Sequence, residues 1–250
     1  MDDLLTPPPI REEHEAMSAK LSGIVAEGKE TMPEVIAPLV CKPLELEPWR
    51  VFKIMSEFVT GFELIQKYST AASFFGSERA QPDNPAYQAA TELAARLARY
   101  GFAIITGGAQ GIMEAANKGA HDAGGASLGL NIRLQSNQPT NTYTTESMFF
   151  DHFFVRKVML TFSSSVYIYF PGGFGTLDEF FEILTLVQTG KIKRIPIVLY
   201  GKEFWTPLLT LFKDELATKY RTISPEEMDL FHVVDSVDEA YEYITKNVVC

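Results

Sequence analysis

The chain has 250 residues, of which 46% are hydrophobic and 22% charged, and these proportions exclude collagen-like, coiled-coil and wholly disordered proteins. Its 32 acidic and 22 basic residues give a formal charge of −10, which disfavours broad attraction to nucleic acid or to an anionic membrane. Cys41 and Cys250 are too far apart in sequence to indicate a disulfide framework or a zinc site. We therefore expect a cytoplasmic protein with no nucleic-acid or membrane partner.

Residues 1–46 are predicted to form an N-terminal, partly helical arm. A short helix is expected near residues 11–28, and closely spaced prolines after it rule out one long helix. The rest of the chain, residues 47–250, is predicted to be a single α/β domain. It opens with an amphipathic helix over residues 47–68, where apolar side chains recur at helical spacing.

From residue 71 onward, short β-rich runs alternate with helical stretches, which predicts βαβ units and a Rossmann-like parallel sheet with helices on both faces. The run Val166–Phe170 is apolar at every position and is therefore expected near the centre of the sheet. The predicted strands are 71–75, 102–106, 126–132, 166–170, 195–200 and 231–234. The predicted helices are 85–100, 112–123, 151–163, 176–190, 203–220 and 236–247.

Three turns that follow predicted strands are rich in glycine or polar residues, and they span residues 75–79, 106–111 and 171–176. Ligands of open parallel sheets bind beyond the carboxyl ends of the strands, and helix-start amides can hold a phosphate without a basic patch. Each turn could also simply be a tight connection. The turns lack the NTPase Gly-Lys-Ser/Thr ending, and Asn131 stands where a dinucleotide site would need an acidic residue. The pattern therefore favours a mononucleotide over NAD.

The segment Thr176-Leu177-Asp178-Glu179 allows two interpretations. It matches a helix capping box, in which Thr176 caps the helix and Glu179 bonds back to the cap amide. Alternatively, Glu179 is a functional carboxylate that the helix dipole holds ionised beside a phosphate loop. Such a group could stabilise an oxocarbenium ion or deprotonate a water, and it would be a poor general acid.

Upstream, Arg156 and Lys157 are adjacent charges in a very apolar helix. They could lie on a solvated face, although Arg is also the side chain suited to bidentate phosphate recognition. His152 follows Asp151, but no serine or cysteine nucleophile motif is nearby, so a local structural role is expected for His152.

The run Pro171-Gly172-Gly173-Phe174-Gly175-Thr176-Leu177-Asp178-Glu179, with Arg156-Lys157 before it, resembles the signature of the LOG ("lonely guy") family, cytokinin riboside 5′-monophosphate phosphoribohydrolases long labelled lysine decarboxylases. Further similarity lies in 75–77, 111–117 and 186–191. The resemblance implies a nucleotide-binding catalytic domain that hydrolyses the N-glycosidic bond of a nucleoside 5′-monophosphate, without metal or organic cofactor. It implies Arg156 and Glu179 as the catalytic pair. The implied substrate-binding residues are Gly76, Ser77, Gly107, Gly108, Gly111, Glu114, Lys157, Gly172, Gly173, Gly175 and Thr176.

One departure from the family pattern concerns the first glycine loop, where Ala109 and Gln110 replace Gly-Pro. The Ala109 methyl group could restrict the approach of a ligand to the backbone. A second hypothesis is therefore a nucleotide-binding or sensing protein with weak turnover. Amino-acid decarboxylation is disfavoured, because no cofactor-lysine context is recognisable.

The helix after the signature is apolar around nearly its whole circumference, with only Glu182 and Thr185 polar in residues 180–187. A helix that covers one face of a sheet needs only one apolar stripe. We therefore expect at least a homodimer, with Phe181 and Leu184 in its interface. The resemblance also implies a dimer or a higher homo-oligomer. The alternative is that the arm of residues 1–46 covers this helix.

Overall fold

The computed structural model describes residues 48–134 and 140–248. The arm predicted over residues 1–46, its helix near 11–28 included, lies outside the described residues. Within the described ranges, no helix is both long enough and apolar enough to cross a membrane.

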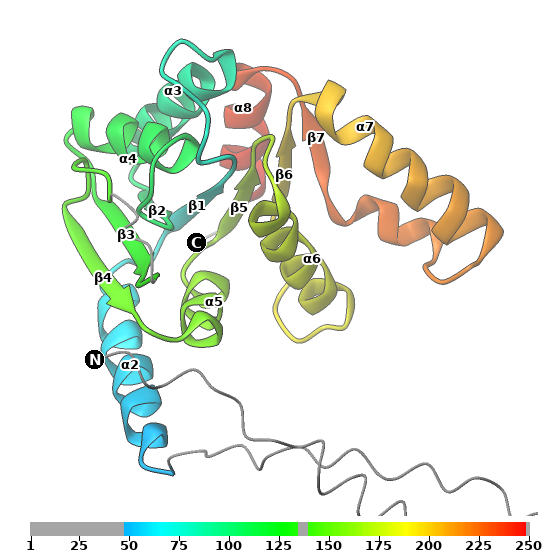
Figure 1. The fold of residues 1–250 in the computed structure, drawn as a ribbon. Coiled ribbons are helices and arrows are strands. Elements are labelled where there is room, and N and C mark those ends of the chain that lie inside the picture. Colours follow the sequence, from blue (N-terminus) through cyan, green and yellow to red (C-terminus); the bar gives the residue numbers. More distant parts are fainter. Residues whose placement is uncertain (1–47, 135–139, 249–250) are drawn as a thin grey trace, which may run out of the picture. The chain divides into compact units, whose positions relative to one another are not determined.

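A parallel sheet of seven strands forms the centre of the structure (Figure 1), and its strand order is β4-β3-β2-β1-β5-β6-β7. Every neighbouring pair of strands is parallel. The strands are β1 (Ala71–Phe75), β2 (Ala103–Thr106), β3 (Ser127–Ile132), β4 (Glu146–Phe150), β5 (Val166–Tyr169), β6 (Ile197–Tyr200) and β7 (His232–Val234). The predicted Rossmann-like α/β fold is therefore confirmed.

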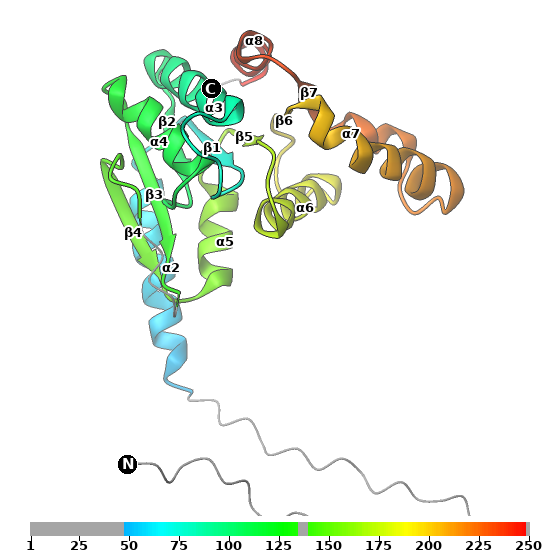
Figure 2. The same cartoon turned by 45° about the horizontal axis from the view of Figure 1, so that its top comes forward.

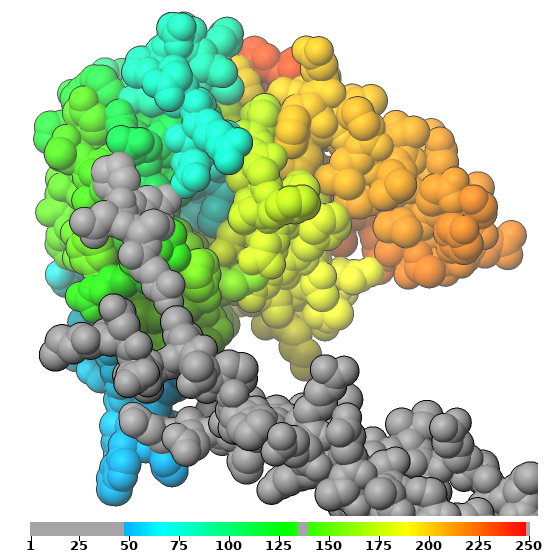
Figure 3. Space-filling view, viewed as in Figure 1, coloured from blue at the N-terminus to red at the C-terminus, as the bar shows by residue number. Residues whose placement is uncertain are grey.

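Helices cover both faces of the sheet (Figures 1 and 2), with α3, α4 and α8 on one face and α2, α5, α6 and α7 on the other. Their bounds are α2 (Arg50–Ile65), α3 (Pro85–Tyr100), α4 (Ile112–Asp122), α5 (Phe153–Phe162), α6 (Phe174–Gln188), α7 (Lys202–Leu211) and α8 (Val237–Asn247). The predicted helix 203–220 continues past α7 as a π-helical segment, η1 (Phe212–Lys219), which projects from the body in orange in Figure 3. A short 3₁₀ helix, η2 (Pro225–Leu230), precedes β7.

The strands alternate their side chains between two hydrophobic cores, as a sheet buried on both faces requires. On β5, Tyr167 and Tyr169 belong to the core under α5 and α6, whereas Val166 and Ile168 belong to the core under α3 and α4. All four side chains are fully buried. β5 lies beside the central strand β1, so its predicted position near the centre is confirmed.

The chain reverses its direction of winding between β1 and β5. From β1 it proceeds outward through β2, β3 and β4, and it then returns to place β5 on the other side of β1. Ligands of doubly wound sheets bind at this reversal, beyond the carboxyl ends of the strands. The loops after β1, β2 and β5 are therefore the place to look for a site.

Candidate functional site

The three predicted loops meet at the carboxyl edge of the sheet and are joined by backbone hydrogen bonds. The Ser77 amide donates to the Pro171 carbonyl, with 3.0 Å between nitrogen and oxygen, and the Ile112 amide donates to the Ser77 carbonyl at 3.0 Å. The loop after β1 thus links the other two. This arrangement brings Gly76 and Ser77 next to the loops of residues 107–111 and 171–176.

Two glycines of the middle loop have backbone conformations that other residues rarely adopt. Gly108 has φ +72° and Gly111 has φ +69°. A Cβ atom at Gly111 would also meet the Ser77 carbonyl, and one at Gly108 would meet the Asn131 side chain. The departure at Ala109 falls at neither position, and the Ala109 side chain is buried.

A buried polar network, which sequence analysis missed, braces this middle loop. The Thr106 hydroxyl accepts from the Gly108 amide at 2.9 Å and donates to Asn117 Oδ1 at 2.5 Å. Asn141 Nδ2 donates to the same Asn117 oxygen and to the Ala109 carbonyl, each at 3.0 Å. Because buried polar groups need partners, this network fixes the loop against α4 and the chain after β3.

The loop after β5 begins helix α6 earlier than predicted. The helix starts at Phe174 with Gly173 as its N-cap, and no side chain caps it. The capping-box interpretation of Thr176 and Glu179 is therefore wrong, because Thr176 already lies inside the first turn. The Thr176 and Leu177 amides donate to the Gly173 carbonyl, at 3.0 and 3.1 Å, which leaves the Phe174 and Gly175 amides at the helix start for a ligand.

The glycines of this loop leave its backbone accessible. A Cβ atom at Gly173 or Gly175 would meet nothing within 4 Å, whereas one at Gly172 would collide with the Thr176 hydroxyl. Thr176 is buried, and its hydroxyl lies against Gly172. Free amides at a helix start next to open space form the kind of surface that binds a phosphate group.

Glu179 lies one turn further along α6 and is buried, with 7% of its surface exposed. Its backbone carbonyl accepts from the Tyr169 hydroxyl, but its Oε2 atom is buried without a hydrogen-bond partner among the described residues. Burial raises the pKa of Glu179 from 4.5 to about 7, although Lys157 and Arg156 oppose the rise. This shift is opposite in direction to the one expected from the helix dipole, and Glu179 lies beyond the first turn of α6. Glu179 can exchange a proton near neutral pH.

Arg156 reaches from α5 to the ends of β2 and β3. Its Nε atom donates to the Leu130 carbonyl at 2.6 Å, and its guanidinium lies directly over Gly107, where a Cβ atom would collide with it. Burial lowers the pKa of Arg156, and Glu179 partly offsets this effect. Among the described ion pairs there is no contact between Arg156 and Glu179, so the two charges interact across a gap.

Two other predicted residues contact helices rather than the loops. The Glu114 carboxylate accepts from the Tyr87 hydroxyl of α3 at 3.1 Å. Lys157 Nζ lies 2.7 Å from Asp178 Oδ2 and 3.1 Å from Glu182 Oε2, both on α6. The structure thus gathers the glycine loops, Arg156 and Glu179, while Lys157 points to α6.

His152 has the structural role expected of it. Its Nδ1 atom lies 3.1 Å from Glu57 Oε1, and Arg50 Nε donates to its Nε2 atom at 3.1 Å. Because Arg can only donate, Nε2 is the acceptor and Nδ1 carries the proton. The backbone amides of Asp151 and His152 also donate to the Glu57 carboxylate, which joins the start of α5 to α2.

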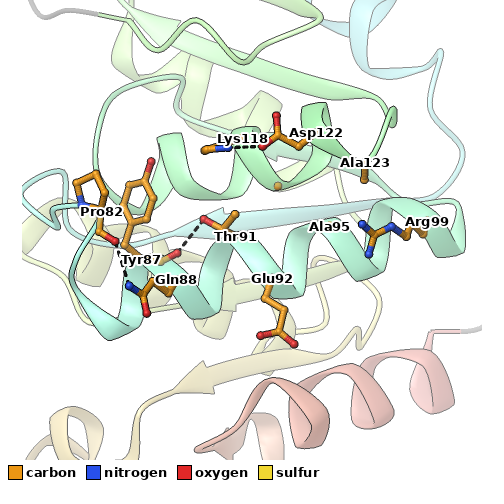
Figure 4. Close-up of a pocket in the computed structure, with 11 residues that line it drawn as sticks. Pro82, Tyr87, Gln88, Thr91, Glu92, Ala95, Arg99, Lys118, Asp122 and Ala123 are labelled. Atoms are coloured by element: carbon orange, nitrogen blue, oxygen red, sulfur yellow. Dashed lines mark hydrogen bonds and ion pairs between the residues drawn. The ribbon is translucent and has the colours of Figure 1, made fainter.

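An open groove of about 460 Å³ lies between α3 and α4 (Figure 4), and it contains none of the predicted site residues. Lys118 and Asp122, which line it, pair with each other. Across the described ranges, no three His, Cys, Asp or Glu side chains are grouped so that they could hold a metal ion.

The fold and the site define a Rossmann-like α/β protein with glycine-containing loops at the carboxyl edge of its sheet, a buried Glu179 and a half-buried Arg156. The profile of the family described as "Possible lysine decarboxylase" matches residues 113–244, just over half of the chain. The chain therefore belongs to this family, which includes the LOG proteins.

Two plant relatives illustrate the similarity. The Arabidopsis thaliana protein "Cytokinin riboside 5'-monophosphate phosphoribohydrolase LOG5" is 30% identical over 160 residues, which cover 63% of this chain and 68% of the relative. The LOG7 protein of the same plant, with the same description, is 25% identical over 199 residues, which cover 75% and 90%.

Solved structures support the fold. The molybdenum cofactor binding protein of Rippkaea orientalis has a TM-score of 0.55 and 20% identity, over 71% of this chain and 96% of that one. The molybdenum cofactor carrier protein of Chlamydomonas reinhardtii has a TM-score of 0.51 and 21% identity over the same shares.

Proposed function

We propose that the protein hydrolyses the N-glycosidic bond of a nucleoside 5′-monophosphate and releases a free base and ribose 5-phosphate. The observation that carries this proposal is the buried Glu179 carboxylate, whose Oε2 atom has no hydrogen-bond partner among the described residues and which lies near Arg156 where the glycine loops converge. A site that only binds phosphate has no need of a buried carboxylate. Membership of the family and the two plant relatives support the same reaction class.

In this mechanism the amides at the start of α6 and the Thr176 hydroxyl hold the 5′-phosphate. As the bond between C1′ and the base nitrogen breaks, its electron pair leaves with the base and positive charge develops on the ribose. The ionised Glu179 takes a proton from a water whose oxygen bonds to C1′. The proton then passes to the base, so water is divided between the two products. Arg156 stabilises the negative charge of the bound phosphate or leaving base.

The test is an assay of AMP and of an N6-isopentenyl AMP, with free base and ribose 5-phosphate measured together by chromatography. Release of both products in equal amounts supports the hydrolase, and the ratio of kcat/KM values identifies the preferred nucleotide. A thermal shift with AMP, made in parallel, addresses the alternative of a sensing protein. Stabilisation by AMP without release of adenine would overturn the hydrolase and support the sensor.

We also propose a homodimer, but through a surface other than the predicted one. The apolar circumference of α6 is partly covered within the chain, because Phe180 is buried against Trp205 and one side of Phe181 packs on Phe212 of η1. Leu184 packs against the same core. Phe174 and Phe181 nevertheless remain exposed on α6, at 93% and 41%, so the predicted surface offers a partner a small apolar area. The arm of residues 1–46 lies outside the described residues.

The large exposed apolar surface is instead on α2 and α5. Phe52, Met55, Val59 and Phe62 follow one another at spacings of three and four residues, as in the seam of a coiled coil, and all are exposed. Trp49 and Phe162 extend this stripe. At about 200 Å² for an aromatic side chain, the exposed fractions of Trp49, Phe52, Phe62 and Phe162 amount to about 480 Å², and Met55 and Val59 add to this area. This approaches the ~800 Å² that one partner buries in a standard interface.

A second copy of the chain fits this α2–α5 stripe, because a helix with such a seam can pair with itself across a two-fold axis. The Met55→Glu variant should sediment as a monomer at a low micromolar concentration at which the wild type sediments as a dimer. Tyr220→Glu, which alters an exposed aromatic residue just after η1, is the control and should leave the dimer intact. A wild type that is an active monomer would contradict the proposal.

A further inference from the structure

Lys157 contacts a different part of the site from its neighbour Arg156. Consecutive residues of a helix point about 100° apart, and here Arg156 reaches the Leu130 carbonyl while Lys157 reaches α6. Lys157 Nζ lies between Asp178 Oδ2, at 2.7 Å, and Glu182 Oε2, at 3.1 Å. Lys157 therefore links the helix that carries Arg156 to the helix that carries Glu179.

The two acceptors of Lys157 bracket Glu179 on α6. Asp178 precedes Glu179 directly, and Glu182 follows it by nearly one turn. The Lys157 side chain is 21% exposed and that of Glu182 is 28% exposed, so solvent only partly screens this ion pair. The ammonium group already donates a hydrogen bond to Asp178 and forms an ion pair with Glu182. Lys157 is thus poorly placed to be the phosphate ligand that the family resemblance implies.

The charges that face Glu179 come from three elements. Arg156 and Lys157 lie on α5, Asp178 and Glu182 lie on α6, and the hydroxyl-bearing side chains Tyr167 and Tyr169 come from β5. The two cations favour the ionised form of Glu179, and the two acidic neighbours oppose it. Of the cations, Lys157 has the larger effect on the pKa of Glu179.

We propose that Lys157 is a positioning residue. Through its hydrogen bond to Asp178 and its ion pair with Glu182, it holds the Glu179 turn of α6 beside α5 and supplies the charge that keeps Glu179 available as a base. Only the predicted effect of Lys157 on turnover rests on the proposed hydrolysis. The link between the two helices and the effect on the Glu179 proton exist whether or not the protein hydrolyses a nucleotide.

The first test measures the Glu179 proton directly and needs no turnover. Protein labelled with ¹³C at the glutamate carboxyl carbons is titrated by NMR, and Glu179→Gln identifies the Glu179 signal. Lys157→Met should raise the titration midpoint of Glu179, by on the order of 1 pH unit, because a positive charge that favours its ionised form is lost. Lys157→Arg should restore a midpoint near the wild-type value, and Glu182→Gln should lower it because a like charge is lost.

The second test uses turnover. Lys157→Met should lower kcat/KM at pH 6.5 by about tenfold and recover most of the wild-type value at pH 9, where Glu179 is ionised again. Inhibition by ribose 5-phosphate should not change, because Lys157 does not hold the phosphate. Lys219→Met, which breaks an exposed pair with Glu215 on η1, is the matched control and should alter neither measurement.

These outcomes separate the two proposals. An unchanged Glu179 midpoint in Lys157→Met, together with inhibition by ribose 5-phosphate weakened at least tenfold, would make Lys157 a phosphate ligand and overturn the inference. If Lys157→Met does not fold, the other two variants decide the matter. An unchanged Glu179 midpoint in Lys157→Arg would support the role of a positive charge at position 157. An unchanged Glu179 midpoint in Glu182→Gln would overturn the role of Glu182. A wild type without hydrolytic activity would refute the proposed function, while the NMR titration would still decide the role of Lys157.

Discussion

Replacement of Glu179 by Gln separates catalysis from stability, because the two should change in opposite directions. The variant keeps the size of the side chain and loses its charge. If Glu179 is the base, turnover of AMP should fall on the order of 10²–10⁴-fold, the usual contribution of a positioned acid–base group. The free energy of unfolding should nevertheless rise at alkaline pH, because an ionised carboxylate without a partner is costly to bury.

The size of this stabilisation follows from the pKa of Glu179, which burial raises from 4.5 to about 7. The difference corresponds to about 3 kcal/mol. Because the folded-state pKa is the higher one, the folded protein retains a proton that the unfolded chain loses between pH 4.5 and pH 7. Wild-type stability therefore falls as pH rises through this interval. The Glu179→Gln variant does not titrate at this position, so its free energy of unfolding should not fall in this interval.

Thermal unfolding at fixed protein concentration measures the effect. At pH 4.5 the two proteins should be similar, and at pH 8 the variant should melt higher by about 6–12 °C, at 2–4 °C per kcal/mol for a chain of this size. Glu242→Gln, an exposed carboxylate on α8, is the control and should melt like the wild type at both pH values. A Glu179→Gln protein that is less stable than wild type at pH 8 would show that the ionised carboxylate has a stabilising partner and would refute the reasoning.

Three further predictions address the rest of the site. Arg156→Lys keeps the charge but loses the Nε hydrogen bond to the Leu130 carbonyl and the planar guanidinium group, so kcat/KM for AMP should fall about 10²-fold. Adenine release at the wild-type rate would remove Arg156 from the mechanism. EDTA should not change the rate at which the wild type releases adenine, because no three His, Cys, Asp or Glu side chains among the described residues are grouped to hold a metal ion. Loss of activity with EDTA that a divalent ion restores would contradict this prediction. Asn117→Ala leaves Thr106 without its buried acceptor and should lower the free energy of unfolding by about 2–3 kcal/mol, as measured by urea titration, whereas an unchanged midpoint would show that the network contributes nothing.

The sequence predicted six of the seven strands because each is a short apolar run between turn residues. β4 was missed for a physical reason. It is an edge strand with alternating half-exposed and exposed residues, and its first residue, Glu146, is held by Lys67 and Tyr68 from the end of α2. Its apolar end, Met148–Phe150, directly precedes the helix predicted over residues 151–163 and is too short to indicate a strand by itself. Only pairing with β3, which is distant in sequence, makes it a strand.

The positions of the site loops could be predicted, but their internal chemistry could not. Parallel strands end at one edge, so the meeting of the loops follows from the topology. The start of α6 at Phe174 rather than Thr176 depends on the backbone of two glycines, and that difference converts Glu179 from a capping residue into a buried carboxylate. The Asn117–Asn141 bond joins residues 24 apart whose polar side chains carry no local signal of burial.

The separation of Arg156 and Glu179 is itself informative about the chemistry. Glu179 is buried and Arg156 is half-buried, and burial shifts the pKa of each toward the neutral form, yet the two do not pair in contact. A direct ion pair would be the simpler way to stabilise two buried charges, and its absence among the described residues leaves each charge available to a third group. Glu179 would then stabilise a ribose ring that gains positive charge. Arg156 would stabilise a phosphate or leaving base that carries negative charge. Burying the ionised Glu179 carboxylate lowers the free energy of unfolding. A positively charged transition state next to Glu179 could recover that same free energy.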